Sequence, residues 1–128
     1  MARILIVDDD VDVRTLFSLC LARRGHHIVL ASDGAEALAA VTVCLPDLVI
    51  TDLTMPVMDG LELLRQLREN GHRDLPVIVV TARPDRRPAA DALGASAYLV
   101  KPISMHHLTE VVQQLLAARS EGGGRCLA

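Results

Sequence analysis

The chain has 128 residues, enough for one domain with a single buried core. Its net charge of −3 argues against broad affinity for nucleic acid, which requires a basic face. Apolar residues make up 51% of the chain but aromatic residues only 2%, so the core must be built from aliphatic side chains.

Five apolar segments of strand length alternate with segments of helical period. In chain order, the strands are predicted at residues 3–7, 27–31, 47–51, 76–81 and 97–100. Helices with one apolar face are predicted at residues 13–21, 33–43, 59–70, 88–93 and 104–116. The first helix carries its apolar residues at Val13, Leu16, Phe17, Cys20 and Leu21, so we expect Cys20 to be a buried free thiol.

Local signals mark several helix ends. Asp33 with Glu36, and Asp59 with Glu62, have the spacing of a capping box at the start of a helix. Ser104 is the expected N-cap of the last helix.

Strands this apolar need cover on both faces, so the alternation predicts an α/β fold with a parallel sheet between two layers of helices. Right-handed crossovers leave few topologies, and the flavodoxin-like doubly wound order, (βα)5, is the usual one for five units. We assign residues 1–120 to this domain and residues 121–128 to a flexible Gly-rich tail or the start of a linker.

Polar side chains with complementary chemistry stand where the strands end. They are Asp8, Asp9 and Asp10 after the first strand, Asp52 after the third, Thr81 at the end of the fourth and Lys101 after the fifth. In an open parallel sheet these ends share one edge, and ligands bind there near the point where the strand order reverses. Asp10 taken alone is better explained as the cap of the first helix, but the joint placement of the others indicates a site.

The composition of this cluster favours a metal-assisted reaction at phosphorus. Clustered carboxylates repel one another unless a cation neutralises them, and a hard ion such as Mg²⁺, or Mn²⁺ in its place, prefers oxygen ligands. Asp52 can then stay ionised and act as a nucleophile toward phosphorus. Lys101 and the Thr81 hydroxyl would stabilise the charge on the transferring group together with the metal.

The chain resembles the response-regulator receiver domain over about residues 2–119. The resemblance rests on four segments, ILIVDDD, LVITDLTMPVMDGLELL, PVIVVTA and AYLVKP. It implies that Asp52 is the phosphoacceptor and that Asp8 and Asp9 are the acidic pair that holds Mg²⁺, Asp8 more often through water. It also implies that the backbone carbonyl of Thr54 is the third metal ligand from the protein.

The resemblance further implies a conformational switch. Thr81 matches the hydroxyl residue that moves toward the phosphoryl group, Lys101 the family lysine, and Tyr98 the aromatic residue that fills the vacated space. Pro102, whose preceding peptide bond is commonly cis in the family, should help aim Lys101. The expected result is a population shift on the surface of the fourth helix, fifth strand and fifth helix. A simpler interpretation also stays open, in which Tyr98 is an aromatic residue that packs on its strand and has no role in switching.

One stretch departs from the family pattern. Between Thr81 and Tyr98 the chain is shorter than the family leads us to expect, and it contains Pro84 and Pro88. Proline can open a helix but breaks its interior, so we predict a short or irregular fourth helix after an Arg-rich lead-in. We hypothesise that Arg83 approaches the phosphoryl group and tunes its lifetime.

Two other classes of protein share part of this sequence pattern. Asp8 to Asp12 can be read as the D-x-D-x-V signature of a haloacid dehalogenase-like phosphatase with Asp8 as its nucleophile. That reading leaves Asp52 without a role and lacks an acidic metal-binding motif downstream of Lys101. A flavodoxin-like cofactor binder would need Gly, Ser or Thr loops where this chain has acids.

The receiver interpretation predicts a phosphoacceptor switch rather than an enzyme, with at most self-catalysed phosphorylation and dephosphorylation. The family implies a sensor histidine kinase or a histidine phosphotransfer protein as donor, and an output partner or a missing C-terminal output domain. A homodimer formed on phosphorylation stays open. With no apolar run near the roughly 20 residues of a membrane span, no secretory signal and no metal spacing among the cysteines, we expect a cytoplasmic protein without membrane contact.

Overall fold

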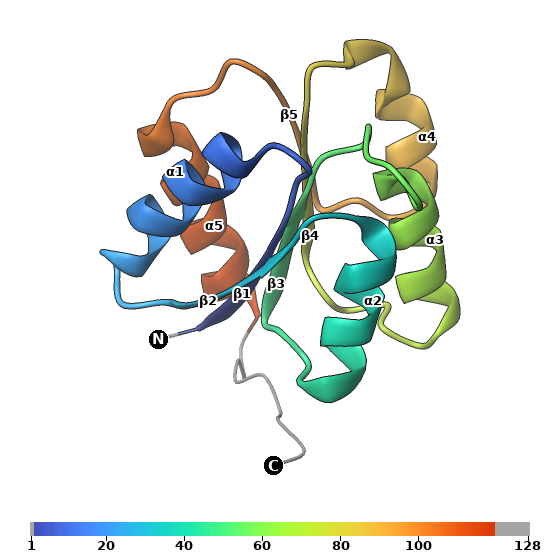
Figure 1. Cartoon of the computed structure of the whole chain (residues 1–128), viewed down its shortest axis with the longest axis horizontal. Helices are drawn as coiled ribbons and strands as arrows, with labels where there is room; N and C mark the ends of the chain where they lie inside the picture. The colour runs from blue at the N-terminus through green and yellow to red at the C-terminus, as the bar shows by residue number, and fades with distance from the viewer. Residues whose placement is uncertain (1, 120–128) are drawn as a thin grey trace.

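Five parallel strands form one sheet between two layers of helices in a computed structural model that describes residues 2–119 (Figure 1). The sheet has the order β2-β1-β3-β4-β5, with β1 (Arg3–Val7), β2 (His27–Ala31), β3 (Leu48–Thr51), β4 (Val77–Thr81) and β5 (Ala97–Val100). The helices are α1 (Val11–Ala22), α2 (Gly34–Val43), α3 (Gly60–Glu69), α4 (Arg87–Ala92) and α5 (Met105–Ala118). The predicted doubly wound (βα)5 fold is confirmed.

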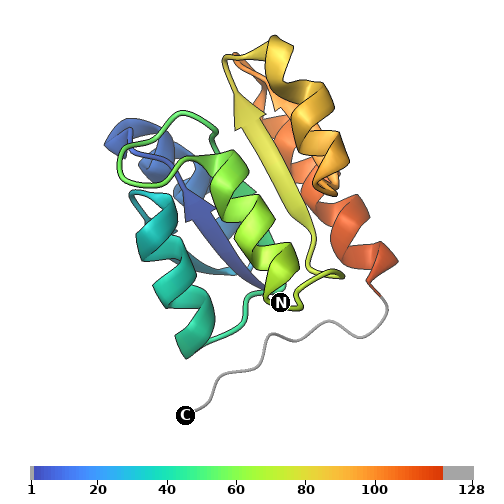
Figure 2. The same ribbon diagram turned by 90° about the vertical axis from the view of Figure 1, so that its right-hand side faces the viewer.

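Each face of the sheet has its own core, because successive side chains of a strand point to opposite faces. Ile4 and Ile6 of β1 pack with α1 and α5, chiefly with Phe17, Leu21, Leu108 and Val112. Leu5 and Val7 pack on the other face against α2 and α3, chiefly with Ala37, Val41, Leu63, Leu64 and Leu67. Figure 1 shows α1 and α5 to the left of the sheet and the other three helices to its right, and Figure 2 shows α3 in front of the strands.

The predicted fourth helix is short, as expected. A 3₁₀ turn at Pro84–Arg86 leads directly into α4, which has six residues and carries Pro88 in its first turn. The other elements agree closely with the sequence, except that β3 and β4 each begin one residue later than predicted. The predicted tail at residues 121–128 lies outside the described residues.

Some local predictions were wrong. Leu16 on α1 is 51% exposed, because this helix buries a narrow face centred on Phe17 and Leu21. For the same reason Cys20 is only partly buried, although it is a free cysteine.

Each predicted capping box forms only one of its two hydrogen bonds. Asp33 and Asp59 accept from the backbone N–H groups of Glu36 and Glu62, as predicted. However, the Glu36 carboxylate accepts from Ser32, and the Glu62 carboxylate accepts from side chains on its own helix. No helix within residues 2–119 is both long and apolar enough to cross a membrane.

Candidate functional site

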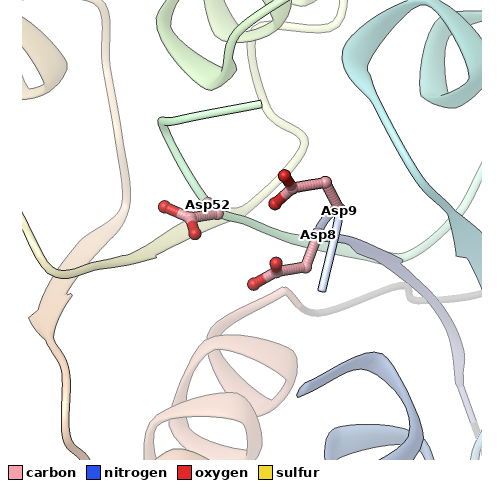
Figure 3. Close-up of side chains that lie close together, drawn as sticks. All are labelled: Asp8, Asp9 and Asp52. Carbon is pink, nitrogen blue, oxygen red and sulfur yellow. The ribbon is translucent and has the colours of Figure 1, made fainter. Parts of the chain in front are cut away.

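Three carboxylates meet at the carboxyl ends of β1 and β3. The two strands are neighbours with Val7 opposite Thr51, and the backbone N–H of Asp52 extends the ladder by donating to the carbonyl of Val7 at 3.0 Å. This register places Asp8 and Asp9 beside Asp52, with one oxygen from each of the three within 4.8 Å of the others (Figure 3). Asp8 and Asp52 are 3% and 9% exposed, whereas Asp9 is open to solvent.

Lys101 brings a positive charge to this cluster from the end of β5. Its Nζ donates to Oδ2 of Asp8 at 3.1 Å and to Oδ2 of Asp52 at 3.0 Å. The backbone N–H of Lys101 donates to the carbonyl of Thr81 at 2.8 Å, which ties the end of β5 to the end of β4. Three strands therefore supply the charged atoms, as the sequence predicted.

Backbone N–H groups orient both buried carboxylates. Oδ1 of Asp52 accepts from Leu53 at 2.6 Å and from Thr54 at 3.4 Å. Oδ1 of Asp8 accepts from the N–H of Asp10 at 2.9 Å. Since Oδ1 is engaged in each residue, Oδ2 of each is the oxygen that faces Lys101.

Burial dominates the electrostatics of Asp8. Loss of solvent raises the pKa of its carboxyl above the usual range, although bonds from the Asp10 backbone and from Lys101 oppose the shift. Burial disfavours the charged form of Lys101 as well, but the bonds to Asp52 and Asp8 outweigh it and the pKa of the ammonium is raised. One ammonium shared between two carboxylates leaves the three-carboxylate cluster with net negative charge.

The donor set fits a hard divalent cation. Carboxylate oxygens are the ligands that Mg²⁺ prefers, and it usually keeps several waters and uses only one or two carboxylates. Here Asp9 lies on the exposed side of the cluster, where water has access, while Asp8 and Asp52 close the buried side. Thr54, the predicted carbonyl ligand, is exposed in the loop directly after Asp52.

Thr81 and Tyr98 are joined through the backbone of Arg83. The hydroxyl of Thr81 accepts from the N–H of Arg83 at 3.2 Å, and the hydroxyl of Tyr98 donates to the carbonyl of the same residue. Tyr98 is 7% exposed and packs with Leu53, Val79 and Ala90. Burial raises the pKa of its phenol. Among residues 2–119 the Thr81 hydroxyl bonds to no member of the acidic cluster.

The remaining predicted residues lie at the borders of the site. Asp10 caps α1 by accepting from the N–H groups of Asp12 and Val13, which supports the capping interpretation. The peptide bond between Lys101 and Pro102 is cis, as the resemblance implied. The Arg83 guanidinium forms two bonds with Asp85, at 3.0 and 2.9 Å, on the solvent side of the β4–α4 loop.

Two supporting residues were missed from the sequence. Arg14 donates from Nη1 to the backbone carbonyl of Asp8 at 2.6 Å and so holds the loop that carries the acids. Gly60 packs so closely that a Cβ there would lie 2.0 Å from the carbonyl oxygen of Asp52. The spacing of Asp59 and Glu62 predicted the start of α3, but it gave no signal for the close packing of Gly60.

Comparison with known proteins agrees with this geometry. Residues 4–113 match the family described as the response regulator receiver domain. The chain is 43% identical over 124 residues to response regulator MprA of Mycobacterium sp. (strain KMS), an alignment that covers 95% of this chain and 54% of that protein. It is 44% identical over 116 residues to MprA of Mycobacterium leprae, with coverage of 89% and 50%. The chain thus spans about half the length of these relatives.

Solved structures share the fold. Chemotaxis protein CheY4 of Vibrio cholerae superposes with a TM-score of 0.85 at 33% identity, over 90% of this chain and 98% of that one. TrrA of Thermotoga maritima, solved in complex with Mg(2+)-BeF, superposes with a TM-score of 0.83 at 36% identity, over 90% and 99%. This match favours the receiver interpretation over the dehalogenase-like phosphatase and the flavodoxin-like cofactor binder. With its acidic pocket at the expected edge of the sheet, the chain belongs to the response-regulator receiver domain family.

Proposed function

We propose that Asp52 accepts a phosphoryl group from a phosphohistidine, carried by a sensor histidine kinase or a histidine phosphotransfer protein. The observation that supports this most directly is the position of the Asp52 carboxylate. It is fixed through Oδ1 by two backbone N–H groups and presents Oδ2 to Lys101, beside two further acids. A nucleophile held in this way loses little freedom on reaching its reactive geometry.

In the proposed reaction, an oxygen of Asp52 forms a bond to phosphorus while the bond to the donor's imidazole nitrogen breaks. The electron pair of the broken bond leaves with that nitrogen. Lys101 stands where it can donate to an oxygen of the transferring group. Mg²⁺, which Mn²⁺ can replace, would be held by Asp8, Asp9, Asp52 and the Thr54 carbonyl, and when bound it neutralises charge on the phosphoryl oxygens. The similarity to TrrA, which was solved with Mg(2+)-BeF, supports this assignment.

The switch that follows would run through the β4–α4 loop. A phosphoryl group adds nearly two negative charges and strong acceptor oxygens near Thr81. To donate to that group, the Thr81 hydroxyl would move away from the N–H of Arg83, whose carbonyl holds Tyr98. We therefore propose that Thr81 and Tyr98 change together and that the surface of α4, β5 and α5 reports the phosphorylation.

Labelling with a small phosphodonor tests the site directly. With phosphoramidate and Mg²⁺, we expect the wild-type chain to gain the mass of one phosphoryl group and the Asp52→Asn variant to gain none. Asp33→Asn, which changes a capping acid at the start of α2, should label as the wild type does. A chelator should abolish labelling of the wild type and of Asp33→Asn. Labelling of Asp52→Asn at the wild-type level would refute the assignment.

The role of Arg83 is proposed from its surroundings. Its side chain lines a pocket of about 220 Å³ with Leu53 and Thr54, the residues whose N–H groups bind Asp52. Its ion pair with Asp85 is exposed, and exposed pairs of this kind contribute little to stability. A doubly charged phosphoryl group can compete for Arg83 and would then be shielded from water. We expect Arg83→Ala to shorten the phosphoryl lifetime and Asp85→Asn to lengthen it. An unchanged dephosphorylation rate in Arg83→Ala would rule this out.

The length of the matched relatives bears on how this receiver domain passes on its signal. Because the matched MprA proteins are about twice as long as the aligned region, an output domain C-terminal to this receiver is one arrangement, and a stand-alone regulator acting through protein contacts is the other. In either case we propose a cytoplasmic switch that carries out no catalysis beyond its own phosphorylation and dephosphorylation. A homodimer formed on phosphorylation would be one means of output.

A further inference from the structure

A second concave site lies at the opposite edge of the sheet from the acidic cluster. It has a volume of about 600 Å³ and opens between the ends of α1 and α5. Ala2, His26 and Asp47, which line it, each come directly before a strand, whereas the acids and Lys101 come after one. In Figure 1 this edge of the sheet is at the bottom, beside the lower ends of α1 and α5. None of its residues takes part in the proposed phosphoryl transfer.

The polar wall of this cavity is mostly cationic. Arg24 approaches Thr109 with only a long contact of 3.5 Å, and Arg119 donates from Nη1 to the backbone carbonyl of Asp47 at 2.6 Å. A guanidinium has five N–H groups, so each of these contacts uses only one of them. The carboxylate of Asp47 is 2% exposed and accepts from the backbone N–H of Arg3 at 2.8 Å. Among the described residues that line the wall, Asp47 is the only acid, and its carboxylate is directed toward the start of β1.

His26 adds a neutral donor to the same wall. Its Nδ1 accepts from the N–H of Ala2 at 3.3 Å, so the neutral imidazole carries its proton on Nε2. Burial lowers the pKa of this imidazole, in keeping with a neutral ring.

The rest of the lining is apolar and comes from helices. Leu21 is fully buried beneath the cavity, and Leu116 and Ala117 form the wall on α5. Pockets of roughly 300–1,000 Å³ with apolar walls and a few convergent polar groups are typical small-molecule sites. We propose that this cavity binds a small organic anion with a flat apolar body, its charged group bound by Arg24 and Arg119 and its body packed on Leu116 and Ala117.

A pair of probes that differ only in charge tests the proposal. The full chain would be titrated with 2-naphthoate and with 2-naphthamide and followed by the shifts of its backbone amides in ¹H–¹⁵N spectra. We expect saturable shifts for naphthoate at Arg24, His26 and Thr109, with a dissociation constant on the order of 1 mM or tighter. Naphthamide should bind about tenfold more weakly, because it lacks the charge-assisted bonds. Absence of saturation, equal binding of the two probes, or shifts at the acidic cluster instead would each overturn the proposal.

Matched variants separate charge from shape. Arg24→Gln should weaken naphthoate binding about tenfold and leave naphthamide binding unchanged, whereas Arg23→Gln, its neighbour outside the lining, should change neither. Ala117→Phe should fill the cavity and abolish binding of both probes, while Ala118→Phe, which lies outside the lining, should not. Because Arg23, Arg24, Ala117 and Ala118 are all exposed, these variants should keep the fold. Equal effects within either pair would contradict the site.

Discussion

Single backbone positions govern the acidic site as much as its charged side chains do. Gly60 donates to the carbonyl of Leu53 at 3.0 Å and lies against the carbonyl of Asp52. Through this contact the start of α3 packs directly against the loop that carries the proposed phosphoacceptor. The closeness is possible only because glycine has no Cβ, so the loop and the helix depend on each other.

We therefore predict that Gly60→Ala destabilises the chain by about 3 kcal/mol, at the upper end of overpacking costs. The reason is steric, since the new Cβ would lie 2.0 Å from a backbone oxygen that cannot rotate away. Urea unfolding measures the loss. Gly25→Ala is the control, because nothing lies within 4 Å of its Cβ and only its φ of +90° resists a side chain, at a cost of about 1 kcal/mol. Equal losses would show that steric contact is not the cause.

Val57 shows the reverse situation, a side chain where the backbone does not favour one. It has a φ of +67° in the loop between β3 and α3 and is 84% exposed. This left-handed conformation costs a residue other than glycine about 1–2 kcal/mol, and asparagine tolerates it better than a β-branched residue. We expect Val57→Asn to raise the free energy of unfolding by about 1 kcal/mol. Val43→Asn, at an exposed valine of α2, should give no gain, and a gain there of the same size would point to a general effect of polarity.

At the scale of elements, the sequence predicted what depends on apolar pattern and on strand ends. The strands were found because their runs are apolar on both faces, as in Val77–Thr81, where all five residues are buried. Asp8, Asp52 and Lys101 were found because parallel strands bring their ends to one edge. The short α4 followed from Pro84 and Pro88, since proline restricts where a helix can begin.

The sequence could not predict which hydrogen-bond or packing partner a side chain takes when the candidates come together only in the folded chain. Glu36 has the spacing of a capping box, yet it bonds Ser32 instead of its own cap residue. Cys20 fits an apolar period, but the width of the buried face depends on how α1 tilts against the sheet. Arg68 gave no signal at all, because its three acceptors are backbone carbonyls, which every residue has.

Arg68 joins three segments around the short helix α4. From the last turn of α3 it donates to the carbonyls of His72 and Leu75, at 2.5 and 2.7 Å, and to that of Gly94 at 2.7 Å. Gly94 lies in the loop between α4 and β5, so Arg68 anchors the C-terminal end of α4 to α3. The Arg68 side chain is partly buried, and this burial lowers the pKa of its guanidinium.

We predict that Arg68→Met lowers the free energy of unfolding by about 2 kcal/mol, since bonds from a charged donor to partly buried carbonyls are lost. Hydrogen exchange should also become faster in the loop that contains Gly94. Arg65→Met on the same helix is the control, because the ion pairs of Arg65 with Glu62 and Glu69 are exposed and should contribute much less to stability. Equal losses in the two variants, or unchanged exchange near Gly94, would show that Arg68 is not an anchor.

At the scale of the whole molecule, the two edges of the sheet have opposite character. Within residues 2–119, the carboxyl edge gathers Asp8, Asp9 and Asp52 around the Lys101 ammonium, and the amino edge brings Arg24, Arg119 and His26 into one cavity wall with Asp47. The net charge of −3 conceals this separation. Protonation therefore has opposite consequences at the two edges, because it relieves a buried carboxylate at one and creates a partly buried imidazolium at the other.

His26 supplies a test of this arrangement. Burial lowers the pKa of its imidazole below the ordinary value of 6.5, Arg24 adds to the shift and Asp47 opposes it. The unfolded chain therefore binds this proton more readily than the folded chain. The contribution of His26 to stability is fully present above pH 6.5 and is lost as the pH falls through the lowered pKa.

We predict that the free energy of unfolding, measured in urea, falls less steeply between about pH 7 and pH 5 in His26→Gln than in the wild type, because the glutamine has no proton to take up. Asp8 acts in the opposite sense, since a carboxyl with a raised pKa gains stability as the pH falls, so only the difference between the two proteins reports on His26. His27→Gln, on the exposed neighbouring residue, should retain the wild-type slope. If His26→Gln and His27→Gln changed the slope equally, burial at the amino edge would not be the origin of the effect.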